Sequence, residues 1–542
     1  MRVSQLLKFS ILLVCAALLC LASYQMVIRT NVRAVEVSVI ATDSKGLPVS
    51  GLGASDFRVF DNGKEQTVAS FEKISSRAAP GQAALPPNTY SNRVGDAGAG
   101  QLGKEKQPQV LSMILLDAVN TKYRNQTVVR RAVADILEQI DPAERVAIYV
   151  FGDRFRVIHD FSSDRASLLA KLKAYHGEAT SGDDLLEELE LDVFNQPLVP
   201  PDPVQKKYFD QNRIVDTLGA LEAIANYVKG MPGRKNLLWL SAAFPLEVGT
   251  AQRTIAPAIG FSGPPDQWRS FGPEMARTMA ALNDANVSVY PIDARGLSQA
   301  TPESRGRKTD DASINISTMN SIAAETGGVA YANRSDLARG VRLALDDSRE
   351  VCVMTYYPKA IAEDGAYHQI RVQSTRPGVQ LRFRRGYYAT AGEEERGAGA
   401  ADRLARALSS PLDSSEIGIQ ASVEPASDDA GVLAVAIHVD PADLSLAHDA
   451  DRWTGSLLVQ WLQTGATGER YEGPSRTVPV DLTQEGYQKA MEQGVRLELR
   501  IHRDPASVAL RIAVADERGG RVGSLSARLP PKAAQPAASS GK

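Results

Sequence analysis

The chain has 542 residues, of which 43% are hydrophobic and 23% are charged, and its formal net charge at pH 7 is -3. This length exceeds what one hydrophobic core normally supports, so we expect about two to four domains. The near balance of acidic and basic residues excludes the strongly basic character that is typical of nucleic-acid-binding proteins. We therefore expect no nucleic-acid partner.

The N-terminus predicts export. Arg2 and Lys8 precede the apolar run FSILLVCAALLCLA, in the order of a signal peptide. Residues 1–28 are a cleaved signal peptide or, because residues 9–28 approach the roughly 20 residues that span a bilayer, an uncleaved membrane anchor. Either alternative places the protein in the periplasm or cell envelope, secreted or anchored through this segment. If the leader is removed, Cys352 is the one cysteine that remains in the sequence. Its apolar neighbours predict a buried, inert thiol.

Residues 33–75 predict a small β module. Apolar and polar residues alternate in this stretch around turn signals at 44–46 and 61–63. The following residues, 76–107, are rich in Ala, Gly, Pro and polar residues and have no apolar period. Such a composition is typical of a flexible linker.

Strand patterns alternate with helix patterns from residue 108 to residue 358. This alternation predicts an α/β domain with a doubly wound, mostly parallel sheet that is covered on both faces. The helix candidates carry apolar residues near the helical period. The strand candidates are VLSMILLD, RVAIYVFGD, RVIHDFS, NLLWLSA, VSVYPID and VCVMTYYP.

Further β structure is predicted after the α/β domain. Residues 359–390 predict a β-hairpin that extends the sheet or forms a ribbon beside it. Residues 411–530 contain short strand patterns at regular spacing, which indicate a C-terminal, all-β, sandwich-like domain. Residues 531–542 have too few apolar residues to fold, and we expect this tail to be disordered.

The first strand of the α/β domain ends on Asp117, a hydroxyl follows at Thr121, and DTLGAL opens a later helix with Thr217. This order resembles the von Willebrand factor A (VWFA) domain with its metal-ion-dependent adhesion site. Residues 33–390 are more closely similar to the VWFA-related family first catalogued in acidobacterial genomes, which implies a bacterial protein with a VWFA-like fold. The segments that carry this similarity are GLGASDFRVFDNGKEQ, ILLDAVNT, VAIYVFGDRFRVIHDFSSD, GMPGRKNLLWLS, VYPIDARGL, AAETGGVAY and FRRGYYA.

The resemblance implies a divalent-ion site that is incomplete in this chain. In the VWFA pattern, carboxylates, serine hydroxyls and a distant threonine hydroxyl supply the oxygen ligands that an ion such as Mg²⁺ prefers. Mapped residue by residue, Asp117 keeps the carboxylate, Thr121 stands for the second serine and Thr217 for the distant threonine. Val119 replaces the first serine, and Ser241 stands where a second carboxylate is expected. The site is degenerate, and we expect no tightly bound cofactor.

Two interpretations of this site remain open. In one, Asp117, Asn120 and Thr121 shape a turn and satisfy backbone N–H groups with no ion present, and Asn120 caps the next helix. In the other, Mg²⁺ or Mn²⁺ binds to Asp117, Thr121 and Thr217, with a further oxygen from Asn120 or Ser241.

The carboxyl edge of the expected sheet favours recognition of a partner. Open α/β sheets bind ligands outside the carboxyl ends of their strands. Long insertions at 177–210, 247–273 and 298–313 fall on that edge, and loops of such length are usually functional or disordered. The acidic run at 182–192 is either a solvated helix face or the source of an extra carboxylate. Phe261, Trp268 and Phe271, in the insertion at 247–273, are each either a contact anchor or a core residue.

The sequence contains no recognised catalytic motif. Its six histidines are scattered, and the His-Glu-x-x-His, Gly-x-Ser-x-Gly and Walker patterns are lacking. We expect no enzyme, and the first hypothesis is an exported, non-enzymatic binding or adhesion-type protein whose VWFA-like domain docks a macromolecular (protein) partner without a tightly bound metal. The second is a Mg²⁺- or Mn²⁺-dependent adhesion module with an atypical ion site. The third is an uncharacterised hydrolase.

Overall fold

The computed structural model describes most of the chain. Several sequence expectations fall outside the described residues, namely the leader, the acidic run at 182–192, most of the three long insertions with Phe261 and Trp268, and the disordered tail. Within the described part, no helix combines the length and the apolar character needed to cross a membrane. The described residues are 35–75, 85–93, 110–140, 144–177, 203–231, 233–242, 271–294, 309–332, 337–347, 350–358, 367–388, 399–429, 431–449 and 451–529.

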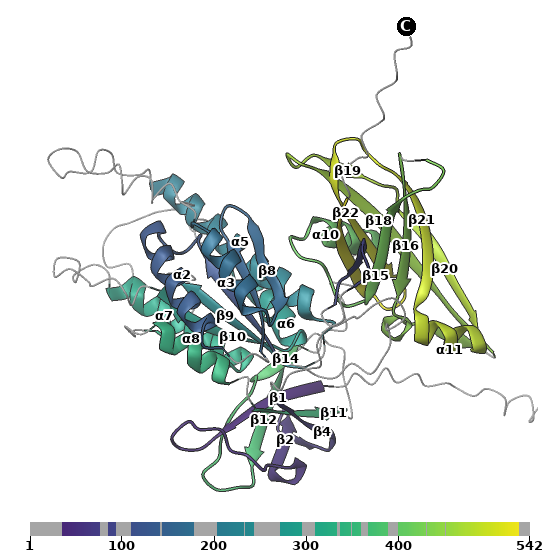
Figure 1. Ribbon diagram of the computed structural model, residues 1–542. Coiled ribbons are helices and arrows are strands. Elements are labelled where there is room, and N and C mark those ends of the chain that lie inside the picture. The colour runs from purple at the N-terminus through teal and green to yellow at the C-terminus, as the bar shows by residue number, and fades with distance from the viewer. Residues whose placement is uncertain are drawn as a thin grey trace, which may run out of the picture.

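The N-terminal module consists of two four-stranded sheets that share one apolar core (Figure 1). Their strand orders are β13-β1-β11-β4 and β14-β12-β2-β3. The turn predicted at 61–63 joins β2 to β3, and Asn62 and Gly63 both have the positive φ that a tight hairpin turn requires. The elements are β1 (Val35–Thr42), η1 (Ala54–Asp56), β2 (Phe57–Asp61), β3 (Lys64–Gln66), β4 (Val68–Ser75), β11 (Glu350–Tyr356), β12 (Tyr367–Ser374), β13 (Gln380–Arg382) and β14 (Gly386–Tyr388).

The structure assigns four late strands, β11 to β14, to this module, which differs from the sequence expectation. We expected VCVMTYYP in the α/β sheet, whereas β11 lies antiparallel between β1 and β4. We expected residues 359–390 to extend that sheet or to lie beside it, whereas β12 pairs with β2 and β13 pairs with β1. An apolar run suits any buried strand, so the pattern alone does not select the neighbour. Cys352 of β11 is a buried, free cysteine, and burial raises the pKa of its thiol to about 11.

The central domain is built on a five-stranded sheet with the order β10-β9-β6-β7-β8. The first four strands in this order run parallel, and β8 pairs antiparallel with β7 at the edge. This is the doubly wound arrangement, and its strand order reverses between β6 and β9. The predicted α/β class with a mostly parallel sheet is confirmed. The strands are β6 (Leu111–Asp117), β7 (Arg145–Phe151), β8 (Phe155–Ser162), β9 (Lys235–Ser241) and β10 (Val287–Asp293).

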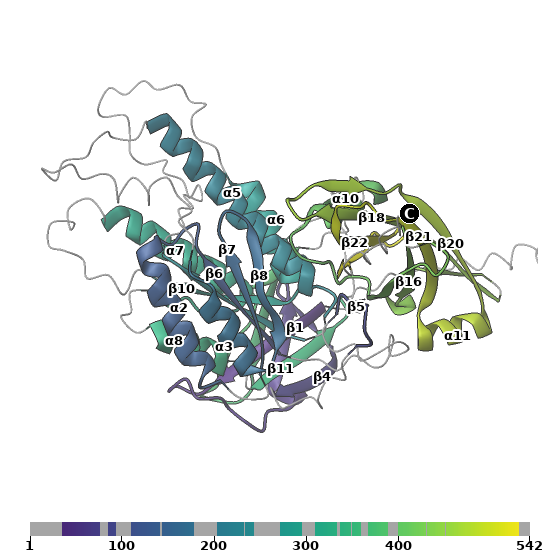
Figure 2. The same cartoon turned by 45° about the horizontal axis from the view of Figure 1, so that its top comes forward.

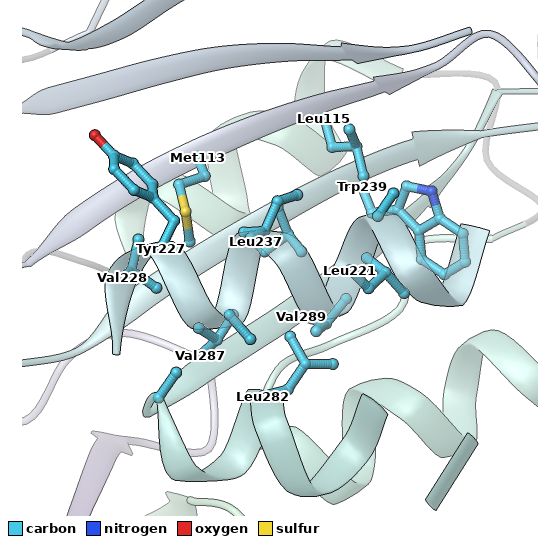
Figure 3. Close-up of a cluster of buried hydrophobic side chains, with 14 of the residues drawn as sticks. Met113, Leu115, Leu221, Tyr227, Val228, Leu237, Trp239, Leu282, Val287 and Val289 are labelled. Carbon is cyan, nitrogen blue, oxygen red and sulfur yellow. The ribbon is translucent and has the colours of Figure 1, made fainter. Parts of the chain in front are cut away.

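Helices cover both faces of this sheet (Figures 1 and 2). α5 (Pro203–Val228) and α6 (Gly272–Asp284) pack on one face, where Figure 3 shows Leu221 and Val228 close to strand residues such as Leu237. On the other face lie α2 (Tyr123–Leu137), α3 (Arg165–Ala174) and α8 (Leu337–Asp346). α7 (Thr309–Thr326) packs beside β10 and contributes Ile322 to the core cluster of α5 and α6. Every residue of β6 is buried, which accounts for its continuous apolar run.

The C-terminal β domain has two sheets around a common core. One has the order β21-β16-β15-β5, and the other contains β17-β18-β22-β23 with β19 and β20 also paired to β18. α10 packs on the outer side of the second sheet. The elements are α10 (Ala400–Ser409), β15 (Ile419–Pro425), β16 (Val432–Val439), η5 (Pro441–Asp443), β17 (Ala447–Asp449), β18 (Arg452–Gly465), β19 (Arg470–Glu472), β20 (Arg476–Thr483), α11 (Gln484–Gln493), β21 (Val495–His502), β22 (Ser507–Asp516) and β23 (Val522–Arg528).

The strand β5 (Thr89–Ser91) corrects the expected linker. Residues 85–93 lie within the stretch 76–107 that the sequence assigns to a flexible linker, yet β5 pairs antiparallel with β15 at the edge of the first C-terminal sheet. This short segment has no apolar period of its own. Side-chain contacts with residues more than three hundred positions later hold it, and no local pattern reveals such contacts.

A buried lysine at the start of β9 makes stability depend on pH. Lys235 is 2% exposed, and its Nζ donates to the carbonyl oxygens of Met231 at 2.5 Å and Gly233 at 3.0 Å. Burial lowers the pKa of Lys235 to about 8, although the nearby Glu36 carboxylate opposes this shift. Because the folded pKa lies below the unfolded value of 10.5, the unfolded chain binds more protons between these values, and stability rises with pH there.

We expect the free energy of unfolding to rise, between pH 8 and pH 10, by about 2 kcal/mol more in the natural chain than in Lys235→Met. Urea unfolding of both proteins at the two pH values measures this difference. The difference between the two proteins excludes the contributions of the other lysines and tyrosines, because both proteins share them. Parallel pH profiles would contradict a lowered pKa of the buried Lys235.

Candidate functional site

The candidate site lies where the strand order of the α/β sheet reverses. Asp117 is the last residue of β6 and Ser241 is the last residue of β9, so both lie at the carboxyl ends of neighbouring parallel strands. Thr217 comes from α5 on one face of the sheet, and its hydroxyl meets the side chain of Asn120 just after β6. This is the position where open α/β sheets bind their ligands.

Hydrogen bonds hold the Asp117 carboxylate from several sides. Asn120 donates its backbone N–H to Oδ1 at 3.0 Å and its side-chain Nδ2 to Oδ2 at 2.8 Å. Trp239 of β9 donates its indole Nε1–H to Oδ2 at 3.0 Å, and the Ser241 side chain also hydrogen-bonds the carboxylate. Asp117 is 1% exposed. Burial raises the pKa of its carboxyl group, and these hydrogen bonds oppose that shift.

Asn120 connects Asp117 to Thr217. Its Nδ2 also donates to the Thr217 Oγ1 at 3.0 Å, and that hydroxyl donates to the Arg213 carbonyl at 2.7 Å. These bonds fix the orientation of the amide, because both neighbours of Nδ2 are acceptors. The Asn120 Oδ1 atom is buried and has no hydrogen-bond partner within the described part of the chain. The expected helix-capping role of Asn120 is wrong, since Lys122 precedes α2 and no side chain caps that helix.

Thr121 points to a different set of partners. Its Oγ1 accepts the backbone N–H of Ala242 at 3.1 Å, and its carbonyl accepts the Gln126 Nε2 at 2.9 Å. These bonds tie the turn after β6 to the end of β9 and to α2. A small cavity of about 10 Å³ lies between Asp117, Thr121, Gln126 and Tyr175, which is room for about one water molecule.

The residues present do not fit a tightly bound divalent ion. Mg²⁺ requires near-octahedral oxygen ligands, and N–H donors already surround the one carboxylate of this site. Thr121 and Thr217 each use their hydroxyl oxygen as an acceptor for N–H groups. Asn120 Oδ1 alone is too little to bind the ion. Within the described ranges, no group of three or more His, Cys, Asp or Glu side chains is arranged so that it could hold a metal ion.

Trp239 belongs to this site and was not predicted. It is fully buried on β9 next to Leu221 in Figure 3, and its indole nitrogen reaches the Asp117 carboxylate. The available sequence signal was its spacing. Trp239 and Ser241 are two residues apart on one strand, so both side chains lie on the same face of the sheet.

Other residues of this edge take separate roles. Phe271 precedes α6, is 5% exposed and packs in the same core cluster as residues of α5 and α6, so it is a core residue. Asp293 ends β10 opposite Ser241 and is buried. Tyr123, at the start of α2, is 44% exposed and lies directly after the turn that contains Thr121.

Comparisons with known proteins leave the family open. Neither a protein-family model nor a curated protein matches this chain. Among solved structures, an aerotolerance-related membrane protein from Bacteroides fragilis matches at 11% identity with a TM-score of 0.24, over 44% of this chain and 98% of that protein. The conserved hypothetical protein BatB from Bacteroides thetaiotaomicron matches at 11% identity and a TM-score of 0.23, over 45% and 98%.

A third solved structure, proximal thread matrix protein 1 from the mussel byssus with a zinc-occupied MIDAS motif, matches at 13% identity and a TM-score of 0.23. The match covers 46% of this chain and 48% of the mussel protein. At such scores and identities, the description of the α/β domain rests on its own strand order and helix placement.

Proposed function

We propose that this chain is an exported, non-enzymatic binding protein that docks a protein partner at the carboxyl edge of its α/β sheet and needs no tightly bound metal ion. The observation that carries the proposal is the hydrogen bonding of Asp117. Its carboxylate binds Asn120, Trp239 and Ser241 of the protein itself and thereby stabilises the shape of this edge.

The surroundings of Asp117 support recognition of a partner. The chain leaves the sheet at this edge after Ser241 and Asp293, and long stretches separate these residues from the helices α6 and α7. Connections of this length in a compact domain are usually functional or disordered. The exposed ring of Tyr123 lies at the same edge, and tyrosine is among the residues that interfaces favour.

Three of the six histidines support a non-enzymatic role through their hydrogen bonds. His368 binds Asp61 inside the N-terminal module, His159 binds Ser167 on α3, and His438 contacts the Gln493 carbonyl in the C-terminal domain. These residues lie in three separate parts of the fold. Each takes part in local structural hydrogen bonding.

A second candidate is a Mg²⁺- or Mn²⁺-dependent adhesion module. One observation favours it, the buried Asn120 Oδ1 that lacks a hydrogen-bond partner among the described residues. A cation bound there would have to draw its other ligands from the partner or from solvent.

Partner capture from an envelope extract separates the two candidates. We expect the mature chain to retain its partner in the presence of a chelator, because no metal completes the interface. Tyr123→Ala should weaken the capture about tenfold or more, since it removes an aromatic anchor. Tyr357→Ala is the matched control, because Tyr357 is similarly exposed at 51% but directly follows β11 of the N-terminal module.

Two outcomes would contradict the proposal. Loss of the partner with chelator, and recovery with Mg²⁺ or Mn²⁺, would favour the metal-dependent module. Equal loss in Tyr123→Ala and Tyr357→Ala would mean that the carboxyl edge is not the binding surface.

A further inference from the structure

Residues 85–93, here named the strap, bind the C-terminal β domain in the manner of a peptide ligand. The strap has the sequence LPPNTYSNR, and its strand β5 lies at the open edge of the sheet β21-β16-β15-β5 (Figure 2). Backbone pairing joins 89–91 to β15, and the Val423 N–H donates to the Asn88 carbonyl at 3.0 Å. An extended peptide that adds a strand to a sheet edge is a recurrent mode of recognition.

Asn92 reads the backbone of the C-terminal domain. Its Nδ2 donates to the carbonyls of Ser414 at 2.6 Å and Ile417 at 2.8 Å, and its Oδ1 accepts the Ile419 N–H at 2.8 Å. The backbone N–H of Asn92 donates to the Ile419 carbonyl at 3.1 Å. Asn92 is 2% exposed, so these bonds use both ends of a buried amide. Few other side chains offer two donors and an acceptor in this geometry.

Arg93 fills an acidic pocket. Its guanidinium lies 3.1 Å from the Asp440 Oδ2 and 2.7 Å from the Asp443 Oδ2, and it donates to the Ser415 carbonyl at 2.9 Å. Arg93 is 9% exposed and the two aspartates are 0% and 8% exposed. Two buried carboxylates require a cation, and a planar guanidinium with several donors satisfies both.

Two glycines leave room for this guanidinium. A Cβ atom on Gly418 would approach the Arg93 Nη1 to 2.5 Å, and one on Gly230 would approach the Ser415 carbonyl oxygen to 1.6 Å and the Arg93 Nη2 to 3.0 Å. Gly230 follows α5 of the α/β domain, and its N–H donates to the Ser415 Oγ at 3.0 Å. The pocket therefore lies where the strap, the C-terminal domain and the end of α5 meet. Lys229 forms an ion pair with Glu416 at 2.7 Å beside it.

We propose that the edge of β15 and the adjoining acidic pocket, together named the groove, form a recognition site for an extended peptide that carries an Asn-Arg pair after a short β-strand. The strap occupies this groove in cis. The strap is then an intramolecular ligand that fastens the C-terminal domain to the rest of the chain. A segment on the same chain has a high effective concentration, so a free peptide competes with it poorly. Removing the side-chain anchors of the strap opens the groove to a peptide added in trans.

The test uses the full chain and a fluorescent peptide LPPNTYSNR. We expect Asn92→Ala/Arg93→Ala to bind this peptide saturably in an anisotropy titration, and the natural chain to bind it at least about 100-fold more weakly, because its own strap fills the groove. A matched peptide with alanine in place of the Asn and Arg should not bind either protein. The peptide should also raise the melting temperature of the double variant and leave that of the natural chain unchanged.

Asn92→Ala provides a second, milder variant, because it keeps the ion pairs of Arg93. We expect it to bind the peptide with intermediate affinity. A variant with native circular dichroism that neither binds the peptide nor gains thermal stability from it would overturn the proposal and leave the strap as an ordinary structural strand. If a variant is unfolded, the peptide at 1 mM, on the order of the effective concentration of a tethered segment, should refold it. Failure of the peptide to refold the variant would also overturn the proposal.

Discussion

Arg93→Ala is expected to lower the free energy of unfolding by about 3 to 5 kcal/mol, because it leaves Asp440 and Asp443 buried without their cation. Urea unfolding followed by circular dichroism measures the change. Arg93→Lys should be intermediate, since it keeps the charge but loses the forked hydrogen bonds to the Ser415 carbonyl.

The matched control for Arg93 lies in the same domain. Arg452 forms an ion pair with Asp481 at 2.6 Å, but both side chains are about half exposed, at 47% and 54%. Exposed pairs contribute little to stability because water screens them. Arg452→Ala should therefore change stability much less than Arg93→Ala. Equal effects of the two substitutions would mean that the acidic pocket is hydrated and that Arg93 does not fasten the strap.

Asp117→Ala is expected to lower the free energy of unfolding by about 3 kcal/mol or more, because each buried donor that loses its acceptor costs about 1 to 3 kcal/mol. The donors at risk are the Asn120 N–H, the Asn120 amide and the Trp239 indole. Asp117→Asn keeps one acceptor oxygen and should be milder. Trp239→Phe removes a single donor and preserves most of the ring volume, so its effect should be the smallest of the three.

The same variants test the metal. If Asp117 serves the hydrogen-bond network alone, millimolar Mg²⁺ or Mn²⁺ should leave the melting temperature of the natural chain unchanged. A ligand at a hundred times its dissociation constant would add about 2.7 kcal/mol, which a thermal melt detects. Calorimetric Mg²⁺ binding that disappears in both Asp117→Ala and Thr217→Ala would sink the metal-free proposal.

Part of the candidate site follows from local sequence. The apolar run of β6 that ends on Asp117 predicts a buried strand with a polar residue at its carboxyl end, and the structure has both. Thr217 on a later helix is brought to the same edge, but it meets Asp117 through Asn120 and not directly. Thr121 binds the backbone of Ala242. The sequence named these positions, while side-chain orientation decided which atoms meet.

The sequence by itself determined the secondary-structure periods, the α/β class and the Asn62-Gly63 turn, because side-chain alternation and backbone φ preferences act over a few residues. Only the tertiary structure decided that β11 joins β1 and β4, that Trp239 reaches Asp117, and that the strap completes the C-terminal domain. These contacts join residues far apart in the chain. Their energy comes from complementary shape, burial and hydrogen-bond geometry, which exist only once distant segments have packed together.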